Sequence, residues 1–549
     1  IDGQFHLPWV YLHALKDYAD MASHLEANPN MQCVVNFTPV LLEQIEDYGV
    51  QCKNWLKTGE AFSDPLLNYL AGITPIPKDT EAREELIRIC LRANASQMIH
   101  PYENFTRLLE TARIENDQSV IDPKQLAYLN DQFFYDLLTW YHIVWLGYSV
   151  KQLPIIQGMI NKGEFFTAED RTQLIQVFEQ VMNKLIERYR QLADKDQVEL
   201  AMTPYAHPIM PLLIDFKSMH DALPEAVAPM SHNYPGGYDR AVWHMEYGIE
   251  VFERFFKRRP QGIWLSEGAV SEQAVKLLDR FDIKWTASGE GVWHNSSYLS
   301  DLDVNDPETR QNLFSCNRLE KANACLFFRD DGLSDLIGFE YQSWNPDDAV
   351  ADFVNHVHNI AKFLQHSDDE HVVSVILDGE NAWEYYPDNG FHFLNKLFKA
   401  LSESKEVETC TFAHASDSCC SVSLPKLCAG SWVYGSFSTW IGEQDKNHGW
   451  DLLVAAKQAY DKNIGHLTLD EKQRAQLQLA VCEGSDWFWW FGDYNPSDSV
   501  RDFDSLYRLQ LQHLYQLLKL EIPDTLFKAI SEGGGDAENA GTMRRGHDG

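Results

Sequence analysis

Residues 262–271 read GIWLSEGAVS, and this stretch indicates both the fold and the chemistry of the chain. The apolar run from Gly262 to Leu265 leads directly to Glu267, and Ser271 then has the character of a helix start. This order predicts a buried strand with an acid at its carboxyl end. A carboxylate in that place is unfavourable unless it is paired, hydrogen-bonded or used in a reaction. Glu267 could therefore cap the next helix, form an ion pair with an arginine or take part in a reaction, and the sequence leaves these roles open.

Similar strand-like runs lie on either side of this stretch. They are VELAMTPYAHP (198–208), IKWTASG (283–289) and ACLFFRD (324–330), which end in polar residues or glycine, and amphipathic segments such as 240–256 lie between the runs. Strands that alternate with helices predict parallel βαβ units. In sheets of that kind the chemistry lies at the carboxyl ends of the strands. The sequence therefore predicts an α/β fold with its site at the edge where Glu267 lies.

The hydrophobic pattern also divides the chain into parts. Residues 1–423 are predicted to form a catalytic α/β barrel. Within them, about 81–193 show helical periodicity, which we interpret as a helical insertion. Residues 424–530 are predicted to be mainly helical. The tail, 531–549, has almost no apolar residues, and this composition predicts disorder.

Charge and composition narrow the classes of function. The 549 residues include 46 Lys and Arg against 81 Asp and Glu, which gives a net charge of −35. This charge argues against nucleic acids as partners and, less strongly, against anionic membranes. No apolar run reaches the length of about eighteen residues that predicts a membrane span. Neutral carbohydrates stay open as substrates, and the 16 Trp and 23 Tyr suit them because sugars stack on aromatic rings.

The spacing of the cysteines and the lack of standard catalytic motifs argue against several further classes of protein. The ten cysteines contain no CxxC pair and no zinc-knuckle spacing. A chain of this length does not need disulfides, so we expect reduced cysteines and a cytoplasmic protein. The start, IDGQFHLPWV, has neither the basic nor the apolar region of a signal peptide. P-loop, HExxH and GxSxG motifs are missing from the sequence, and we expect no cofactor and no metal.

A second acid follows another apolar run. Val372–Leu377 is predicted to be a strand, and Asp378 ends it, with Glu380 and Trp383 close behind in DGENAWEYY. An acid beside aromatic residues is typical of a sugar site. The alternative, an aspartate that caps its loop, has about equal weight for Asp378 taken alone.

Glu267 and Asp378 are more informative together than separately. Acids at the ends of neighbouring parallel strands can face each other across one pocket. Cleavage of a glycosidic bond uses such a pair, one acid as the nucleophile and one as the proton donor. A separation of about 5–5.5 Å between the carboxyl groups would indicate retention of anomeric configuration.

Several further side chains are candidates for substrate binding. His207 lies in TPYAHP at another predicted strand end, and Arg329 in FFRDD could hold an acid ionised. Each has a structural alternative. His207 could form its hydrogen bonds within its own loop, and Arg329 could belong to a solvated loop of ion pairs. The aromatic candidates are Trp264, Trp432 and Trp487, although tryptophans in clusters belong more often to a core.

In combination, these motifs resemble glycoside hydrolase family 57, whose members act on α-glucans as α-amylases, amylopullulanases, branching enzymes and 4-α-glucanotransferases. The resemblance implies that Glu267 is the nucleophile, that Asp378 is the general acid/base, and that His207 lies in the substrate site. It also implies an incomplete (β/α)7 barrel, and SDWFWWFGD and LDGENAWEYY point to the amylopullulanase-like branch. The family's first motif, an HxHQP-like strand with a substrate-contacting histidine, has no counterpart in this sequence, and we expect that strand to be absent.

The sequence thus predicts a retaining α-glucan hydrolase that acts on α-1,4 linkages, with α-1,6 linkages open. A 4-α-glucanotransferase or branching enzyme would use the same two acids. A non-catalytic glucan-binding protein is the alternative of another class. A metal-dependent hydrolase is a further alternative, but the candidate residues lack metal-ligand spacing. The oligomeric state is open.

Overall fold

A seven-stranded sheet organises the computed structural model, which describes residues 3–112, 123–367, 369–535 and 542–546. The sheet runs in the order β1-β2-β3-β4-β6-β5-β7, and its paired strands are parallel except for β5 with β6. The predicted α/β class is confirmed. The strands are β1 (Cys33–Phe37), β2 (Val198–Met202), β3 (Gly262–Ile263), β4 (Trp285–Ser288), β5 (Cys316–Leu319), β6 (Cys325–Phe328) and β7 (Ser421–Leu424).

Close packing brings the carboxyl ends of the middle strands together. A Cβ atom at Gly262 on β3 would lie 1.8 Å from Cε2 of Trp285 on β4, so the strands can approach this closely only with glycine there. Trp285 in turn donates from Nε1 to Oε1 of Glu199 on β2 at 2.6 Å. Because β2, β3 and β4 are parallel, the residues that follow them meet at one edge.

Three parts of the sheet differ from the sequence-based expectation. Val372–Leu377 is not a strand and pairs through one parallel bridge, from Ser374 to Arg329 after β6. Val375 within it is 36% exposed, so this apolar run borders solvent instead of lying inside the sheet. Conversely, β5 and β7 were not predicted, because CNRL and SVSL are short and partly polar.

Two of the ten cysteines also differ from expectation. Cys316 on β5 and Cys325 on β6 form a disulfide across the antiparallel strand pair. The expectation that all ten cysteines are reduced is therefore wrong for these two, because the antiparallel pairing of β5 with β6 brings together two positions that are nine residues apart in the sequence. The cytoplasmic location stays a prediction.

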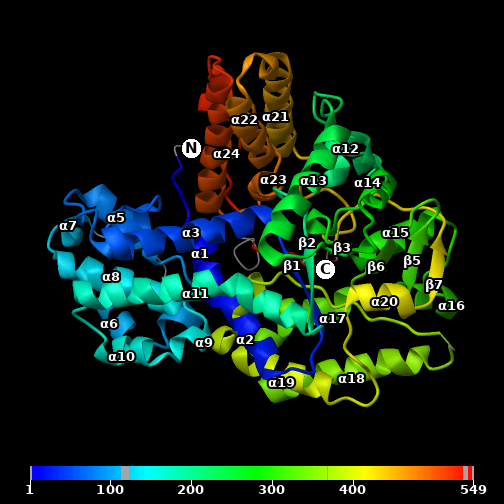
Figure 1. Cartoon of the computed structure of the whole chain (residues 1–549), viewed down its shortest axis with the longest axis horizontal. Helices are drawn as coiled ribbons and strands as arrows, with labels where there is room; N and C mark the ends of the chain where they lie inside the picture. Colours follow the sequence, from blue (N-terminus) through cyan, green and yellow to red (C-terminus); the bar gives the residue numbers. More distant parts are fainter. Residues whose placement is uncertain (1–2, 113–122, 368, 536–541, 547–549) are drawn as a thin grey trace.

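The N-terminal helices and the helices of the predicted insertion cover one side of the molecule, in blue and cyan in Figure 1. α11 packs lengthwise on α3. Between α1 and α2, the N-terminal helical segment contains a π-helical turn, Ala14–Tyr18, with Lys16 and Asp17 buried. These helices are α1 (Trp9–His13), α2 (Ala19–Ala27), α3 (Pro39–Thr58), α4 (Pro65–Ala71), α5 (Thr80–Cys90), α6 (Glu103–Thr111), α7 (Pro123–Leu126), α8 (Asp131–Val144), α9 (Tyr148–Lys151), α10 (Pro154–Lys162) and α11 (Ala168–Asp194).

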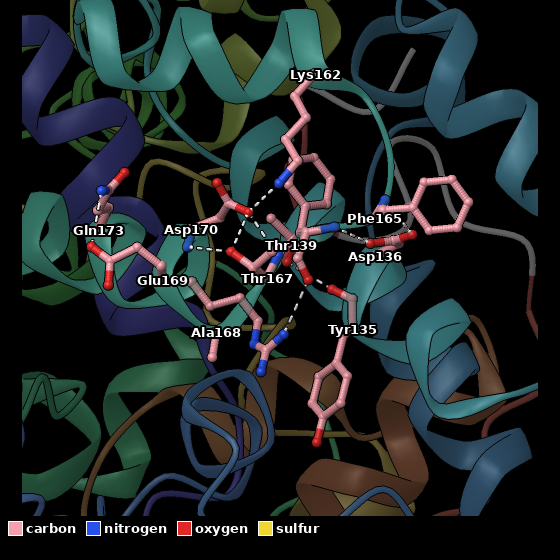
Figure 2. A network of polar contacts seen from close by, with 12 residues as sticks. Tyr135, Asp136, Thr139, Lys162, Phe165, Thr167, Ala168, Glu169, Asp170 and Gln173 are labelled. Carbon is pink, nitrogen blue, oxygen red and sulfur yellow. Dashed lines mark hydrogen bonds and ion pairs between the residues drawn. The ribbon is translucent and has the colours of Figure 1, made fainter.

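Figure 2 shows how the long helix α11 begins. Thr167 and Asp170 form a capping box, in which the Asp170 N–H donates to Thr167 Oγ1 at 3.2 Å and the Thr167 N–H donates to Asp170 Oδ2 at 2.6 Å. Asp136 of α8 accepts from the N–H groups of Phe165 and Phe166 at 2.9 and 2.7 Å. The chain entering α11 is thereby tied to α8.

Helices between and after the remaining strands complete the fold. In Figure 1, α21, α22 and α24 stand side by side as a bundle above the sheet. The helices are α12 (Met210–Ile214), α13 (Gly237–Phe256), α14 (Glu272–Leu278), α15 (Glu290–Leu299), α16 (Pro307–Arg310), α17 (Asp331–Asp335), α18 (Pro346–Leu364), α19 (Phe391–Ser402), α20 (Phe412–Ser418), α21 (Gln444–Asn463), α22 (Leu469–Cys482), α23 (Asp486–Trp490) and α24 (Ser497–Leu517).

The C-terminal helices share a core with the segment that follows β2. Ile209 and Leu212 from that segment pack in one cluster with Trp450 and Phe488. This core holds the helical region against the strand ends where the site lies.

The division of the chain into domains stays a prediction. Of the tail expected to be disordered, Thr542–Gly546 are placed against the rest of the protein. Within the described residues, no helix is long and apolar enough to span a membrane.

Candidate active site

Glu267 occupies a strained turn directly after β3. It lies in the 3-10 turn Ser266–Gly268 with φ 60° and ψ 26°, a left-handed conformation that is uncommon outside glycine. Trp432 donates from Nε1 to Glu267 Oε2 at 3.0 Å, and its backbone N–H donates to the Glu267 carbonyl at 3.2 Å. Trp264 packs edge-on against Trp432, with 5.4 Å between ring centroids. Strain held by a rigid surrounding is common at functional residues.

His207 approaches the same carboxylate from the loop after β2. Its Nε2 lies 3.8 Å from Glu267 Oε1, and its φ of 60° is also left-handed. Ser485, just before α23, places Oγ 2.6 Å from His207 Nδ1 and donates its N–H to the His207 carbonyl at 2.9 Å. Burial lowers the pKa of His207, so the imidazole is neutral around pH 7. The helical C-terminal region thus fixes the orientation of the ring.

Asp378 follows the extended segment beside β6, and its surroundings hold it in place. Asn381 donates from Nδ2 to Asp378 Oδ2 at 3.0 Å. Arg329 donates from Nε to the Ile376 carbonyl at 2.9 Å, two residues before the acid. The same guanidinium forms two ion pairs of 2.6 Å, with Asp331 and Asp335. Its three nitrogens therefore already have protein partners, and Arg329 fixes the segment that leads to Asp378.

The two acids influence each other electrostatically. Burial raises the pKa of Glu267 and the charge on Asp378 raises it further, while the Trp432 hydrogen bond lowers it. Burial also raises the pKa of Asp378, although Asn381 and Arg329 act in the opposite direction. The charge of Asp378 disfavours ionisation of Glu267, so the protonation of the two carboxyl groups is linked. An ionised acid beside a protonated one is what glycosidic cleavage requires.

Glu380 belongs to the same acidic cluster. Burial raises its pKa to about 7, the charge of His13 lowers it, and Asp378 and Asp17 raise it. His13 and Asp17 come from the N-terminal helical segment, where His13 Nδ1 lies 2.6 Å from Asp17 Oδ2. The fold therefore brings a part of the chain that the sequence did not single out close to the predicted site.

The predicted aromatic residues are placed differently from one another. Trp264 and Trp432 are half-buried beside Glu267. Trp383 is only 3% exposed and donates from Nε1 to the Gly379 carbonyl at 3.1 Å, so it packs beneath the Asp378 loop. Trp487 is half-buried and donates to the Val481 carbonyl at 2.8 Å. Their roles in substrate binding stay predictions.

Asp486 is the main site residue that sequence reasoning missed. Its charge raises the pKa values of both Glu267 and Asp378. His207, Glu267 and Asp486 each offer a ligand atom, all within 4.8 Å of one another, so these three residues could hold a metal ion. Chemistry by two carboxylates does not need one. The position of Asp486 in the aromatic run SDWFWWFGD was a signal, but that run was interpreted mainly as core.

Comparisons with known proteins bear on the fold and on the family. A comparison with curated protein sequences found no match. Among solved structures, the family 57 branching enzyme of Thermococcus kodakaraensis, crystallised with glucose, matches with a TM-score of 0.55 and 15% identity over 95% of this chain and 89% of that one. The α-amylase AmyC of Thermotoga maritima matches with a TM-score of 0.55 and 13% identity over 93% and 88% of the two chains. The family 57-type branching enzyme of Pyrococcus horikoshii matches with a TM-score of 0.54 and 14% identity over 97% and 94%.

These structural matches confirm the predicted fold, an incomplete (β/α)7 barrel. The sequence model described as Glycosyl hydrolase family 57 matches residues 1–421 of the 549. The match includes β1 to β6, Glu267 and Asp378. As the motifs around these two acids predict, the chain belongs to glycosyl hydrolase family 57.

Proposed function

We propose that the protein is a retaining glycoside hydrolase of α-glucans. The observation that carries this proposal is the pair Glu267 and Asp378, two acids whose pKa values are raised by burial and, for Glu267, by the charge of the other. A site that keeps one carboxyl protonated beside one ionised carboxylate supplies both partners of the reaction.

In the proposed reaction, Glu267 attacks the anomeric carbon and Asp378 protonates the glycosidic oxygen. The bond to the leaving sugar breaks as an ester bond to Glu267 forms. Asp378, now ionised, takes a proton from water, and the water oxygen displaces Glu267 from the anomeric carbon. A proton on Asp378 would remove the charge that raises the pKa of Glu267, and the Trp432 N–H donates a hydrogen bond to the Glu267 carboxylate.

The choice of α-glucan as substrate rests on family membership and on the similar structures. Those structures are two branching enzymes and an α-amylase, and one of them was crystallised with glucose. A branching enzyme or 4-α-glucanotransferase differs from a hydrolase in the second step, where a sugar hydroxyl replaces water. Pure maltotriose separates these outcomes, since glucose and maltose indicate hydrolysis and longer products indicate transfer.

The decisive variant is Glu267→Gln, which keeps the shape of the side chain and removes the nucleophile. Turnover of maltooligosaccharides should fall by at least about a thousandfold, with an unchanged circular dichroism spectrum. Glu272→Gln, on the solvent side of the next helix, is the matched control and should keep wild-type rates. NMR of the first product should show the α-anomer. Wild-type turnover by Glu267→Gln, or a β-anomer, would overturn the proposal, and binding without any product would favour the glucan-binding alternative.

A further inference from the structure

The C-terminal segment Thr542–Gly546 is docked on the rest of the protein although its composition predicts disorder. Met543 is 8% exposed and belongs to the main hydrophobic core. Arg545 forms an ion pair of 3.1 Å with Glu340. An apolar anchor and an ion pair on neighbouring residues give this short segment a defined place.

One end of the segment lies at the loop of Asp378. Asn381 donates from Nδ2 to Asp378 Oδ2 at 3.0 Å, and the same nitrogen donates to the Thr542 carbonyl at 3.3 Å. An amide nitrogen carries two hydrogens and can serve both acceptors. The segment therefore uses the second N–H of a group that already holds a catalytic acid.

The other end, Gly546, lies at the loop that holds the Glu267 carboxylate. Its carbonyl accepts from the Tyr434 N–H at 3.0 Å, and Tyr434 lies two residues after Trp432, which donates from Nε1 to Glu267 Oε2 at 3.0 Å. A Cβ atom at Gly546 would lie 2.5 Å from Cγ of Asp331, so the contact is tight. The segment thus spans from the loop of one acid to the loop of the other.

Arg544, in the middle of the segment, covers two aromatic rings. Its guanidinium lies 4.6 Å from the ring centroid of Trp489 and 4.7 Å from that of Tyr494. It also donates to Thr439 Oγ1 at 3.4 Å and to Asn495 Oδ1 at 3.5 Å. Trp489 is half-buried and Tyr494 is 41% exposed, so both rings lie at the surface beneath the guanidinium.

The short helix α23 places one of these rings next to the acids. Asp486, at its start, offers a carboxylate oxygen within 4.8 Å of side-chain atoms of His207 and Glu267. Trp489 follows Asp486 by three residues, and residues three apart lie on the same face of a helix. Sugar rings stack on aromatic faces, so a glucan that extends from the acids along α23 would reach the rings that Arg544 covers.

We infer that Thr542–Gly546 is a specificity-determining segment, which occupies part of the glucan-binding surface and makes the site favour short maltooligosaccharides over long chains. A long chain would meet Arg544 on the two rings and the Thr542 carbonyl on the Asn381 amide, whereas a short one need not extend so far. The inference rests on the function proposed above and concerns the choice of substrate within it.

Detachment of the segment would leave both acids with their partners. Asn381 would keep its hydrogen bond to Asp378, and Trp432 would keep its hydrogen bond to Glu267. The N–H that now binds the segment, together with the two uncovered rings, would become available to sugar hydroxyls and ring faces. The expected effect is therefore on selection between substrates, and the reaction itself should continue.

The test compares kcat/KM for maltoheptaose with kcat/KM for maltotriose in Arg544→Ala and Met543→Asp. Arg544→Ala uncovers the rings, and Met543→Asp places a charge at the buried anchor and releases the segment. In both variants the ratio should rise about fivefold, which is the effect of a single weak ring contact. The controls are Arg474→Ala on the exposed side of α22 and Met230→Asp at a position that is 84% exposed, and both should keep the wild-type ratio.

A second readout does not depend on turnover. Calorimetric titration of the same variants, each combined with Glu267→Gln, measures the affinity for both sugars, and the ratio in favour of maltoheptaose should rise as well. Circular dichroism checks folding, and if Met543→Asp does not fold, Arg544→Ala decides.

The outcomes separate the inference from the proposed function. Active variants with unchanged ratios would overturn the inference and leave the function standing. Equal losses on both sugars would also overturn it, because a segment that only braces the loops acts on every substrate alike. If no variant cleaves either sugar but the affinity ratio rises, the hydrolase function fails and the role of the segment in glucan selection stands. Lack of binding to either sugar would overturn both.

Discussion

Glu267 and Glu483 both lie near the junction of the sheet and the C-terminal helices, Glu267 half-buried and Glu483 buried, and their surroundings are opposite. Glu483, at the end of α22, receives Arg240 Nε at 2.8 Å and Nη2 at 2.7 Å, His244 Nε2 at 2.8 Å and the Tyr234 hydroxyl at 2.6 Å. Among the described residues, the Glu267 carboxylate receives one hydrogen bond, from Trp432, and the charges of Asp378 and Asp486 raise its pKa.

The pKa values follow from this difference. Burial works against ionisation of Glu483, but Arg240 and His244 outweigh it and hold the pKa at about 2. For Glu267 burial is reinforced by Asp378, and the pKa is raised. A fully paired buried acid stabilises the fold, whereas an incompletely paired one keeps its proton exchangeable. The two are connected, because Ser485, two residues after Glu483, hydrogen-bonds His207 beside Glu267.

We expect the largest effect, a loss of kcat, from a substitution of Asp378, whose charge acts on Glu267. Asp378→Asn removes the proton donor, and kcat should fall by about 10²–10⁴-fold without loss of folding. Aryl glycosides with good leaving groups should recover the first step, because that step no longer needs a proton. Asp388→Asn, the same change on an exposed loop nearby, is the control. Equal loss on natural and activated substrates would contradict the role of Asp378 as the acid.

Glu483→Gln tests how much the paired carboxylate of Glu483 stabilises the fold. It leaves Arg240 buried without its partner charge, and the free energy of unfolding at pH 7 should fall by about 3–5 kcal/mol. Because the folded-state pKa of Glu483 is lowered, its stabilisation is present above the ordinary glutamate pKa. It disappears as the pH falls toward about 2. Denaturant unfolding at several pH values measures this. Glu250→Gln, on the exposed face of α13, should change little, and a pH-independent loss in Glu483→Gln would contradict the ion-pair account.

A smaller effect should come from Asp486→Asn. The charge of Asp486 raises the pKa values of Glu267 and Asp378, so its removal should move both limbs of the kcat/KM profile to lower pH, by less than about one unit. The exposed Asp493, a few residues further on, provides the control variant Asp493→Asn. A shift to higher pH would show that Asp486 acts other than through its charge.

The smallest effect is expected far from both glutamates. Thr167→Ala removes the capping box of α11 and should lower stability by about 1 kcal/mol while kcat and KM stay constant. Denaturant unfolding and a standard assay suffice to measure this. Thr172→Ala, whose hydroxyl only donates back to the Ala168 carbonyl, is the matched control and should be nearly neutral. A change in kcat would show that the insertion is coupled to the site more tightly than its contacts indicate.

The strands that carry the site could be predicted because their sequences are locally distinctive. The largely apolar runs before Glu267 and before His207 end at polar residues, and they contain the strands β3, Gly262–Ile263, and β2, Val198–Met202. The run before Asp378 has the same pattern but pairs through a single bridge, because pairing depends on a neighbouring strand and not on the run itself. Asp486 and Ser485 escaped prediction because an aromatic run does not indicate which of its polar residues will face a distant loop.

The sequence by itself determined the alternation of strands and helices, the two acids that follow apolar runs and the family, since these follow from short-range patterns of apolar and polar residues. The tertiary structure decided how each acid is charged. Glu267 and Glu483 have the same side chain, and the groups that the fold brings against each one differ. Burial and Asp378 raise the pKa of Glu267, whereas Arg240 and His244 lower that of Glu483. Electrostatic energies depend on distance through space, and distance along the chain does not determine them.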